Sequence, residues 1–96
     1  MAHIATLTLA AQNTGTDWID VRASRLVDVS ISGGTGSTVH LQRSYDGGTT
    51  TLDVTAYSAD VEEVSRNAAA CKMRLFCKTG NYVDGATLRI AAGNKE

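Results

Sequence analysis

Two thiols and two imidazoles are the groups in this 96-residue sequence that are best suited to covalent chemistry. A nucleophilic cysteine needs a base within reach, and that base is most often a histidine. His3 lies near the N-terminus, and His40 falls on the expected polar face of a strand, where a solvated side chain is the ordinary case. Cys71 and Cys77 fall at inward-facing positions, where a thiol behaves as a small hydrophobic group. We therefore expect no catalytic residue and no enzymatic activity.

The same groups lack the spacing of a metal site or a disulfide. The sequence contains neither Cys-x-x-Cys nor His-x-x-x-His, so a zinc site has no ligand set. In an extended strand the Cα atoms of Cys71 and Cys77 would lie about 20 Å apart, whereas a disulfide needs them within about 7 Å. We expect two reduced thiols, which fits folding in a cytoplasm, and neither a metal nor any other cofactor.

One polar segment predicts a structural hairpin turn. Its residues are Ser44, Asp46, Gly47, Gly48 and Thr50. An Asp at a hairpin corner accepts backbone N–H bonds, the glycines supply positive φ angles, and the Ser and Thr side chains bond to the ends. The segment resembles the Asp box of sialidase-type propellers, although Thr51 stands where that box has an aromatic residue. In those propellers the box is structural, so the resemblance implies a hairpin and no catalysis.

Alternation of apolar and polar residues, which is typical of β-strands, extends over most of the sequence. The expected strands cover residues 4–10, 18–22, 27–32, 38–45, 52–56, 71–77 and 87–91. Seven or eight short strands at roughly ten-residue spacing predict an all-β fold, a small antiparallel β-sandwich or barrel that is jelly-roll-like. The length suits one domain, so we expect residues 1–96 to form a single β-sandwich domain.

The alternation also predicts side-chain directions. The side chains expected to point into the core are Val27, Val29 and Ile31 in one strand, Leu52, Val54 and Ala56 in another, and Cys71, Met73, Leu75 and Cys77 in a third. Residues 58–70 are ambiguous, because their Ala and Glu content favours a helix while two valines are too few to fix an amphipathic one. We interpret this stretch as an irregular strand or a turn of helix.

The charge balance argues against partners that are recognised by charge alone. Nine Lys and Arg stand against ten Asp and Glu, interspersed along the chain, which indicates neither nucleic acid nor an anionic membrane as a partner. No apolar stretch approaches the ~20 residues of a membrane span, and the N-terminal residues do not resemble a signal peptide. Since neither disulfides nor a metal support so small a core, we expect partner subunits to do so.

Two segments of the sequence share a pattern with a known family. Residues 37–50 read Ser-Thr-Val-His-Leu-Gln-Arg-Ser-Tyr-Asp-Gly-Gly-Thr-Thr, and residues 72–85 read Lys-Met-Arg-Leu-Phe-Cys-Lys-Thr-Gly-Asn-Tyr-Val-Asp-Gly. They resemble the patterns G-T-V-x-L-Q-R-S-x-D-G-G-x-T-W and Y-R-L-x-x-K-T-G-x-Y-x-x-G of small virion proteins of tailed bacteriophages. The resemblance covers roughly residues 33–91. Thr51 and Met73 depart from it, because the family has aromatic residues there.

The resemblance implies a structural protein of the virion, assembled in the cytoplasm of the bacterial host. Capsid decoration or cement is the first expectation, with the major capsid protein and further copies of the chain, such as a trimer, as partners. No small-molecule substrate is expected. A head–tail connector or tail component is the second expectation. A carbohydrate-binding β-sandwich is an alternative from another class, and it would need an exposed aromatic platform.

Three residues are the candidates for an interface with such partners. Ile4 lies in the N-terminal segment, which we expect to order on binding. Phe76 is out of phase with the apolar face of its strand, and an exposed Phe more often marks a protein interface. Tyr82 lies in the second of the two matching segments.

Overall fold

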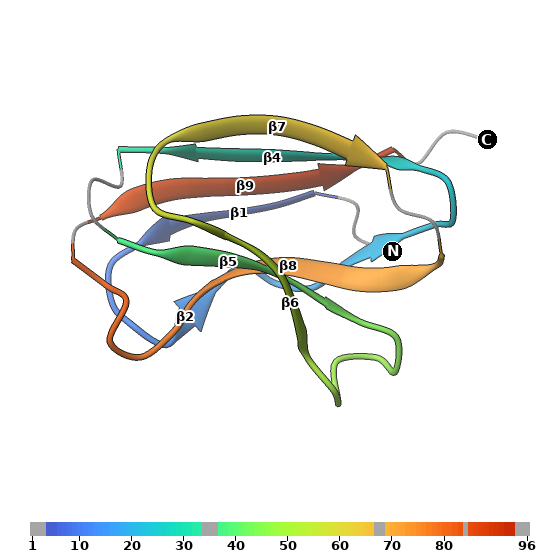
Figure 1. Cartoon of the computed structure of the whole chain (residues 1–96), viewed down its shortest axis with the longest axis horizontal. Helices are drawn as coiled ribbons and strands as arrows, with labels where there is room; N and C mark the ends of the chain where they lie inside the picture. Colours follow the sequence, from blue (N-terminus) through green and yellow to red (C-terminus); the bar gives the residue numbers. More distant parts are fainter. Residues whose placement is uncertain (1–3, 34–36, 67–68, 84, 94–96) are drawn as a thin grey trace.

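The computed structural model describes residues 4–33, 37–66, 69–83 and 85–93, and within them it contains nine β-strands and no helix (Figure 1). The strands are β1 (Ile4–Leu9), β2 (Thr14–Gly15), β3 (Ile19–Val21), β4 (Leu26–Ser32), β5 (Val39–Ser44), β6 (Leu52–Tyr57), β7 (Val61–Arg66), β8 (Cys71–Cys77) and β9 (Ala86–Ala92). Two of them were not predicted as regular strands, since β2 falls between two expected strands and β7 in the ambiguous stretch.

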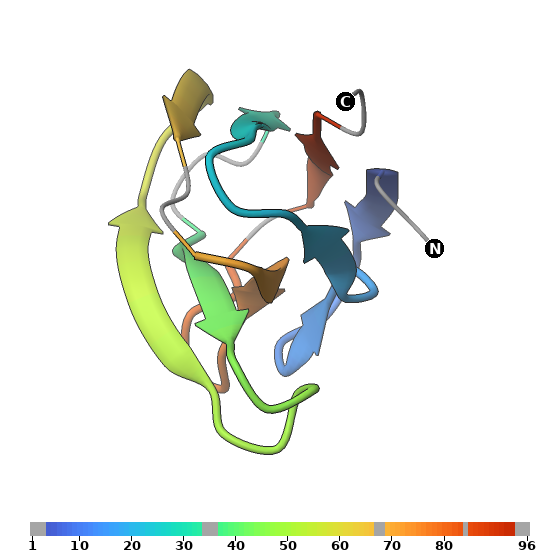
Figure 2. The same cartoon turned by 90° about the vertical axis from the view of Figure 1, so that its right-hand side faces the viewer.

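The strands form two antiparallel sheets that pack face to face (Figures 1 and 2). One sheet has the order β1-β9-β4-β7, and the other has the order β2-β8-β5-β6, with β3 also pairing with β8. If β2 and β3 count as one interrupted strand, the pairs nest inwards from the chain ends: β1 with β9, β2/β3 with β8, β4 with β7, and β5 with β6. This is the connectivity of a jelly roll, and the predicted all-β sandwich is confirmed.

Alternation in β4 and β8 builds the core between the sheets. The buried side chains of these two strands are Val27, Val29, Ile31, Met73, Leu75 and Cys77. The predicted inward direction is therefore confirmed for both strands, except that Cys71 at the start of β8 is only half-buried. Neither of the two cysteines forms a disulfide, and burial raises the pKa of the Cys77 thiol.

The predicted inner face of β6 is wrong. Leu52 and Val54 are 43% and 41% exposed, and Ala56 is exposed as well. The pairing of β6 with β5 shifts register between Leu41 and Gln42, and Figure 1 shows the start of β6, at the hairpin from β5, lying away from the opposite sheet. A strand that bends away at a bulge leaves the cover of the facing sheet, so an alternating pattern there buries little.

Strand β7 corrects the interpretation of residues 58–70, of which 67–68 lie outside the described residues. It is a regular strand whose six residues all pair with β4. The partner strand overrides the helical preference of Ala and Glu, since pairing and burial outweigh intrinsic propensity at a sheet edge. Tyr57 in β6 donates a hydrogen bond from its hydroxyl to Glu63 in β7 at 2.5 Å, which joins the two sheets at this edge.

The opposite edge of the second sheet is interrupted between β2 and β3. Gly15 pairs with Phe76 and Ile19 with Met73, so this edge contains one residue more than β8 beside it. At the interruption, the Thr16 amide donates to the Leu75 carbonyl at 2.8 Å, and the Leu75 amide donates to Thr16 Oγ1 at 3.1 Å. A bulge of this kind redirects the side chains that follow it, and here Trp18 comes to lie over the outer face of the sheet.

Candidate interaction face

The outer face of the sheet β2-β8-β5-β6 carries a row of interacting polar and aromatic side chains, which we call the outer-face cluster. It consists of Trp18, Gln42, Asp53, Arg74, Phe76 and Lys78. Strand β8 positions two of the six members, because it directs alternate residues into the core and leaves Arg74 and Phe76 on the outside. This placement explains why Phe76 is out of phase with the apolar residues of its strand.

Arg74 lies at the centre of the cluster between two aromatic rings. Its guanidinium carbon is 4.4 Å from the centroid of the Trp18 ring and 4.3 Å from that of Phe76. Contacts at this distance are favourable cation–π interactions. Partial burial lowers the pKa of Arg74, yet an arginine remains protonated at physiological pH. A positive charge is thus held in place on the surface between two aromatic groups.

Hydrogen bonds continue the row from Arg74 to the edge strand β6. Arg74 Nε donates to Gln42 Oε1 at 2.9 Å, and Gln42 Nε2 donates to Asp53 Oδ1 at 3.0 Å. Lys78 Nζ forms an ion pair with Asp53 Oδ2. The hydrogen bond from Lys78, followed by that from Gln42, lowers the pKa of Asp53. The side chains of the cluster therefore hold one another in fixed positions across three neighbouring strands.

The Asp46 turn, between β5 and β6, has the hydrogen bonds that its sequence predicts. Asp46 Oδ1 accepts from the Thr50 amide and from Ser44 Oγ, both at 2.7 Å. Ser44 Oγ in turn accepts from the Gly48 amide at 2.8 Å. Hydrogen bonds from Thr50, and then from Ser44, lower the pKa of Asp46 from 3.8 to about 2. Gly47 and Gly48 both have positive φ angles, as this turn requires.

This turn also supports the outer-face cluster. A Cβ atom added to Gly48 would lie 3.1 Å from Nε1 of Trp18, so the turn packs closely against the indole ring. The absence of a side chain at Gly48 therefore allows the Trp18 ring to lie where it does. The role of the turn is structural, in support of a surface that lies beside it.

His40 lies on the same outer face, next to the cluster. Its register partners are Ala56 on one side and Phe76 on the other. The expectation of a solvated side chain is wrong, because His40 is half-buried and its Nδ1 atom is buried without a hydrogen-bond partner among the described residues.

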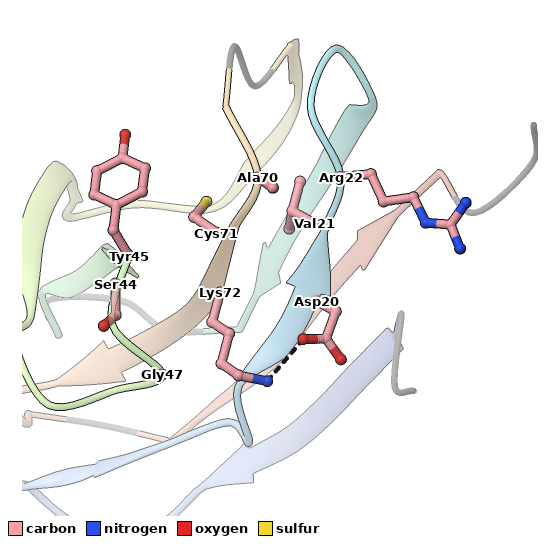
Figure 3. Close-up of a pocket in the computed structure, with 9 residues that line it drawn as sticks. All are labelled: Asp20, Val21, Arg22, Ser44, Tyr45, Gly47, Ala70, Cys71 and Lys72. Carbon is pink, nitrogen blue, oxygen red and sulfur yellow. Dashed lines mark hydrogen bonds and ion pairs between the residues drawn. The ribbon is translucent and has the colours of Figure 1, made fainter.

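A separate groove of about 280 Å³ opens where β3, β5 and β8 meet at one end of the sheet (Figure 3). Its lining residues are Asp20, Val21, Arg22, Ser44, Tyr45, Gly47, Ala70, Cys71 and Lys72. Lys72 Nζ donates to Asp20 Oδ1 at 2.7 Å, and Figure 3 shows Arg22 pointing away from this pair. The described lining contains the Cys71 thiol and no imidazole.

The three predicted interface residues do not come together in the structure. Phe76 belongs to the outer-face cluster. Ile4 is 58% exposed, but it lies on β1 in the other sheet. Tyr82 is half-buried and packs against the hydrophobic core. Sequence reasoning missed Trp18 and Arg74, although the alternation of β8 already placed Arg74 on the outer face beside Phe76.

Comparisons with known proteins do not identify a family for this chain. No family model matches the sequence, and no curated protein matches it. Among the described residues, no group of three or more His, Cys, Asp or Glu could hold a metal ion. The described part of the chain likewise contains no helix long and apolar enough to cross a membrane.

Proposed function

We propose that this chain is a non-enzymatic structural protein of a bacteriophage particle, and that it binds the capsid shell as a decoration or cement protein. Its partners would be the major capsid protein and further copies of itself. The observation that carries the proposal is the outer-face cluster, a preorganised surface of the kind that binds proteins. The pattern of residues 37–50 and 72–85, which resembles that of phage virion proteins, supplies the assignment to a virion.

The composition of the cluster suits protein docking. Trp, Arg and Phe are enriched at protein interfaces, and Trp and Arg account for many of the residues that dominate binding energy. The contacts of Arg74 with Trp18, Phe76 and Gln42 already order these side chains before a partner arrives. Binding then costs less side-chain entropy than it would for mobile groups.

The fold supports the same proposal at the level of analogy. Jelly rolls occur in viral capsid proteins and in lectins, although a fold alone does not determine a function. A rigid sandwich with short turns keeps its outer faces fixed in relation to each other. Such a module suits a protein that is repeated many times over a shell.

Co-sedimentation with capsids that lack this protein tests the proposal. We expect the wild type to bind, and Arg74→Ala to bind about tenfold more weakly or worse, as is typical for a residue at the centre of an interface. Arg89→Ala is the matched control, because Arg89 is an exposed residue of β9 on the outer face of the other sheet. Absence of wild-type binding, or equal loss in both variants, would overturn the assignment of this face to capsid binding.

The other two candidate functions give different results in the same system. A head–tail connector or tail component would bind isolated tails or connectors and leave capsids unoccupied. A carbohydrate-binding module would bind glycans through Trp18, but one face of that ring is already covered by Arg74. Glycan binding that is lost in Trp18→Ala, without any capsid binding, would replace the proposal with this alternative.

A further inference from the structure

The four edges of the two sheets differ in how they are protected against pairing with another strand. Natural edge strands avoid such pairing through bulges, charged side chains or short, broken strands. Strand β6 has a register shift, and β2/β3 is interrupted at Thr16. Strand β7 carries Glu62, Glu63 and Arg66 among its six residues. Each of these three edges therefore has one of the known protective features.

Strand β1 has none of them. Its sequence, Ile-Ala-Thr-Leu-Thr-Leu, contains no charged residue, and its six residues pair with β9 in one uninterrupted register. Among the described residues it lies at the end of its sheet, with β9 as its sole partner. Ala5 and Leu7 on its inner face are only half-buried, and Ile4 is largely exposed. An uncharged, regular edge with incompletely covered apolar residues is a template for a further strand.

We propose that β1 pairs antiparallel with β1 of a second copy of this chain, so that two four-stranded sheets join into one. Alternation restricts the register, because residues that face each other across two strands must lie on the same side of the sheet. Among the pairings that meet this condition, those centred on Thr6 or on Leu7 have the longest overlap, of five residues of β1 in each copy. The first places Ala5 opposite Leu7 of the partner copy, and the second places Leu7 opposite Leu7. Either register covers the inner-face residues that a single copy leaves half-buried.

The symmetry of this pairing favours the second copy over an unrelated strand as the occupant. The same short segment supplies both of the paired strands. On the outer face, each threonine then lies opposite a threonine or Ile4 of the partner copy, and Thr–Thr pairs stabilise antiparallel strands. The two-fold axis runs perpendicular to the joined sheet. It therefore leaves both outer-face clusters on the same side of the dimer. Where the proposed function holds, one dimer could bind a shell through two clusters at once, which raises its avidity.

The oligomeric mass of the full chain, measured by light scattering without capsids, tests the pairing. We expect the wild type to have twice the mass of one chain. The double variant Thr6→Lys/Thr8→Lys places lysines opposite each other in both registers and should be a monomer. The variant Thr6→Glu/Thr8→Glu should be a monomer for the same reason. An equimolar mixture of the two should restore a dimer that contains one copy of each.

Two control variants separate this contact from other effects. Thr49→Lys/Thr51→Lys adds the same charge at exposed turn residues and should remain a dimer. Thr55→Lys lies on the edge strand β6 and should also remain a dimer. A monomeric wild type, a dimer that survives the β1 lysines, or a mixture that stays monomeric would each overturn the proposal. Because no capsid is present, these results do not depend on whether the proposed function is right.

Discussion

Asp46 shows how a single side chain can replace the main-chain contacts of a hairpin. Its carboxylate accepts from the Thr50 amide and from Ser44 Oγ, and both interactions favour the ionised form. The pKa of about 2 in the folded state lies below the ordinary value of 3.8, so the folded state binds this proton less tightly than the unfolded chain. The resulting stabilisation is complete above the unfolded value and disappears as the pH falls through about 2.

We therefore predict that Asp46→Asn lowers the melting temperature at pH 7 and that the difference from the wild type shrinks towards pH 2. Thermal unfolding followed by circular dichroism at several pH values measures this. Asp28→Asn, an exposed carboxylate on the outer face of β4, is the control and should change little at either pH. If the melting temperature of Asp46→Asn stayed below that of the wild type by the same amount from pH 7 to pH 2, the role of the ionised carboxylate would be contradicted.

Gly48 and Gly47 allow a second prediction about single residues in this turn. Both have positive φ angles, and an alanine at either position costs about 1–2 kcal/mol of backbone strain. Only at Gly48 would the added methyl group also press on Trp18, which adds roughly 1–3 kcal/mol of overpacking. Urea unfolding should therefore show a larger loss of stability for Gly48→Ala than for Gly47→Ala. A shift in Trp18 fluorescence should accompany Gly48→Ala alone, and equal effects would show that the turn does not support the indole.

At the scale of elements, the interrupted edge β2/β3 depends on one hydroxyl. Thr16 Oγ1 accepts from the Leu75 amide in a buried position, where a strand would normally supply a carbonyl. Thr16→Val has nearly the same shape but leaves that amide without an acceptor, which costs about 1–3 kcal/mol. Amide exchange at Leu75 should accelerate, together with a fall in the free energy of unfolding. Thr14→Val removes a hydrogen bond at an exposed position and should cost less than about 0.5 kcal/mol.

The elements also show what alternation in a sequence can and cannot predict. Strands β4 and β8 have a partner on each side and a sheet beneath them, so their apolar faces are buried as predicted. Strand β6 has the same kind of pattern at Leu52 and Val54, but its pairing with β5 shifts register and its start lies away from the other sheet (Figure 1). Neither a bulge nor the end of a facing sheet is visible in the pattern of one strand. For the same reason, β7 and the position of Trp18 could not be predicted.

The outer-face cluster could be predicted only in part, because the sequence pattern of one strand does not show which strands become its neighbours. The alternation of apolar and polar residues in β8 predicted that Phe76 lies on the outer face. The sequence of residues 44–50 predicted the hydrogen-bonded turn at Asp46. The row that joins Trp18 to Asp53 depends instead on which strands become neighbours. Residues 18, 42, 53 and 74 are brought together by the nested pairing of a jelly roll, and this long-range order is set by the whole chain.

At the scale of the whole molecule, the two sheets are held together at one side by a contact outside the apolar core. The Tyr57 hydroxyl donates to Glu63 between edge strands of different sheets. Burial, followed by the hydrogen bond to Glu63, raises the pKa of Tyr57 above its ordinary value of 10. The folded state therefore binds the phenol proton more tightly than the unfolded chain. This contribution to stability is complete below pH 10 and is lost as the pH rises above that value.

Tyr57→Phe should accordingly cost about 1 kcal/mol at pH 7, the net value of one hydrogen bond, because Glu63 is exposed and can bond to water instead. Above pH 10 the stability of the wild type should fall more steeply than that of Tyr57→Phe, so the two unfolding curves converge. Urea titrations at pH 7, 9 and 10.5 measure both effects. Tyr45→Phe is the control, since Tyr45 is exposed and lies outside the contact between the sheets. Parallel pH profiles for the wild type and Tyr57→Phe would mean that this hydroxyl does not couple the two sheets.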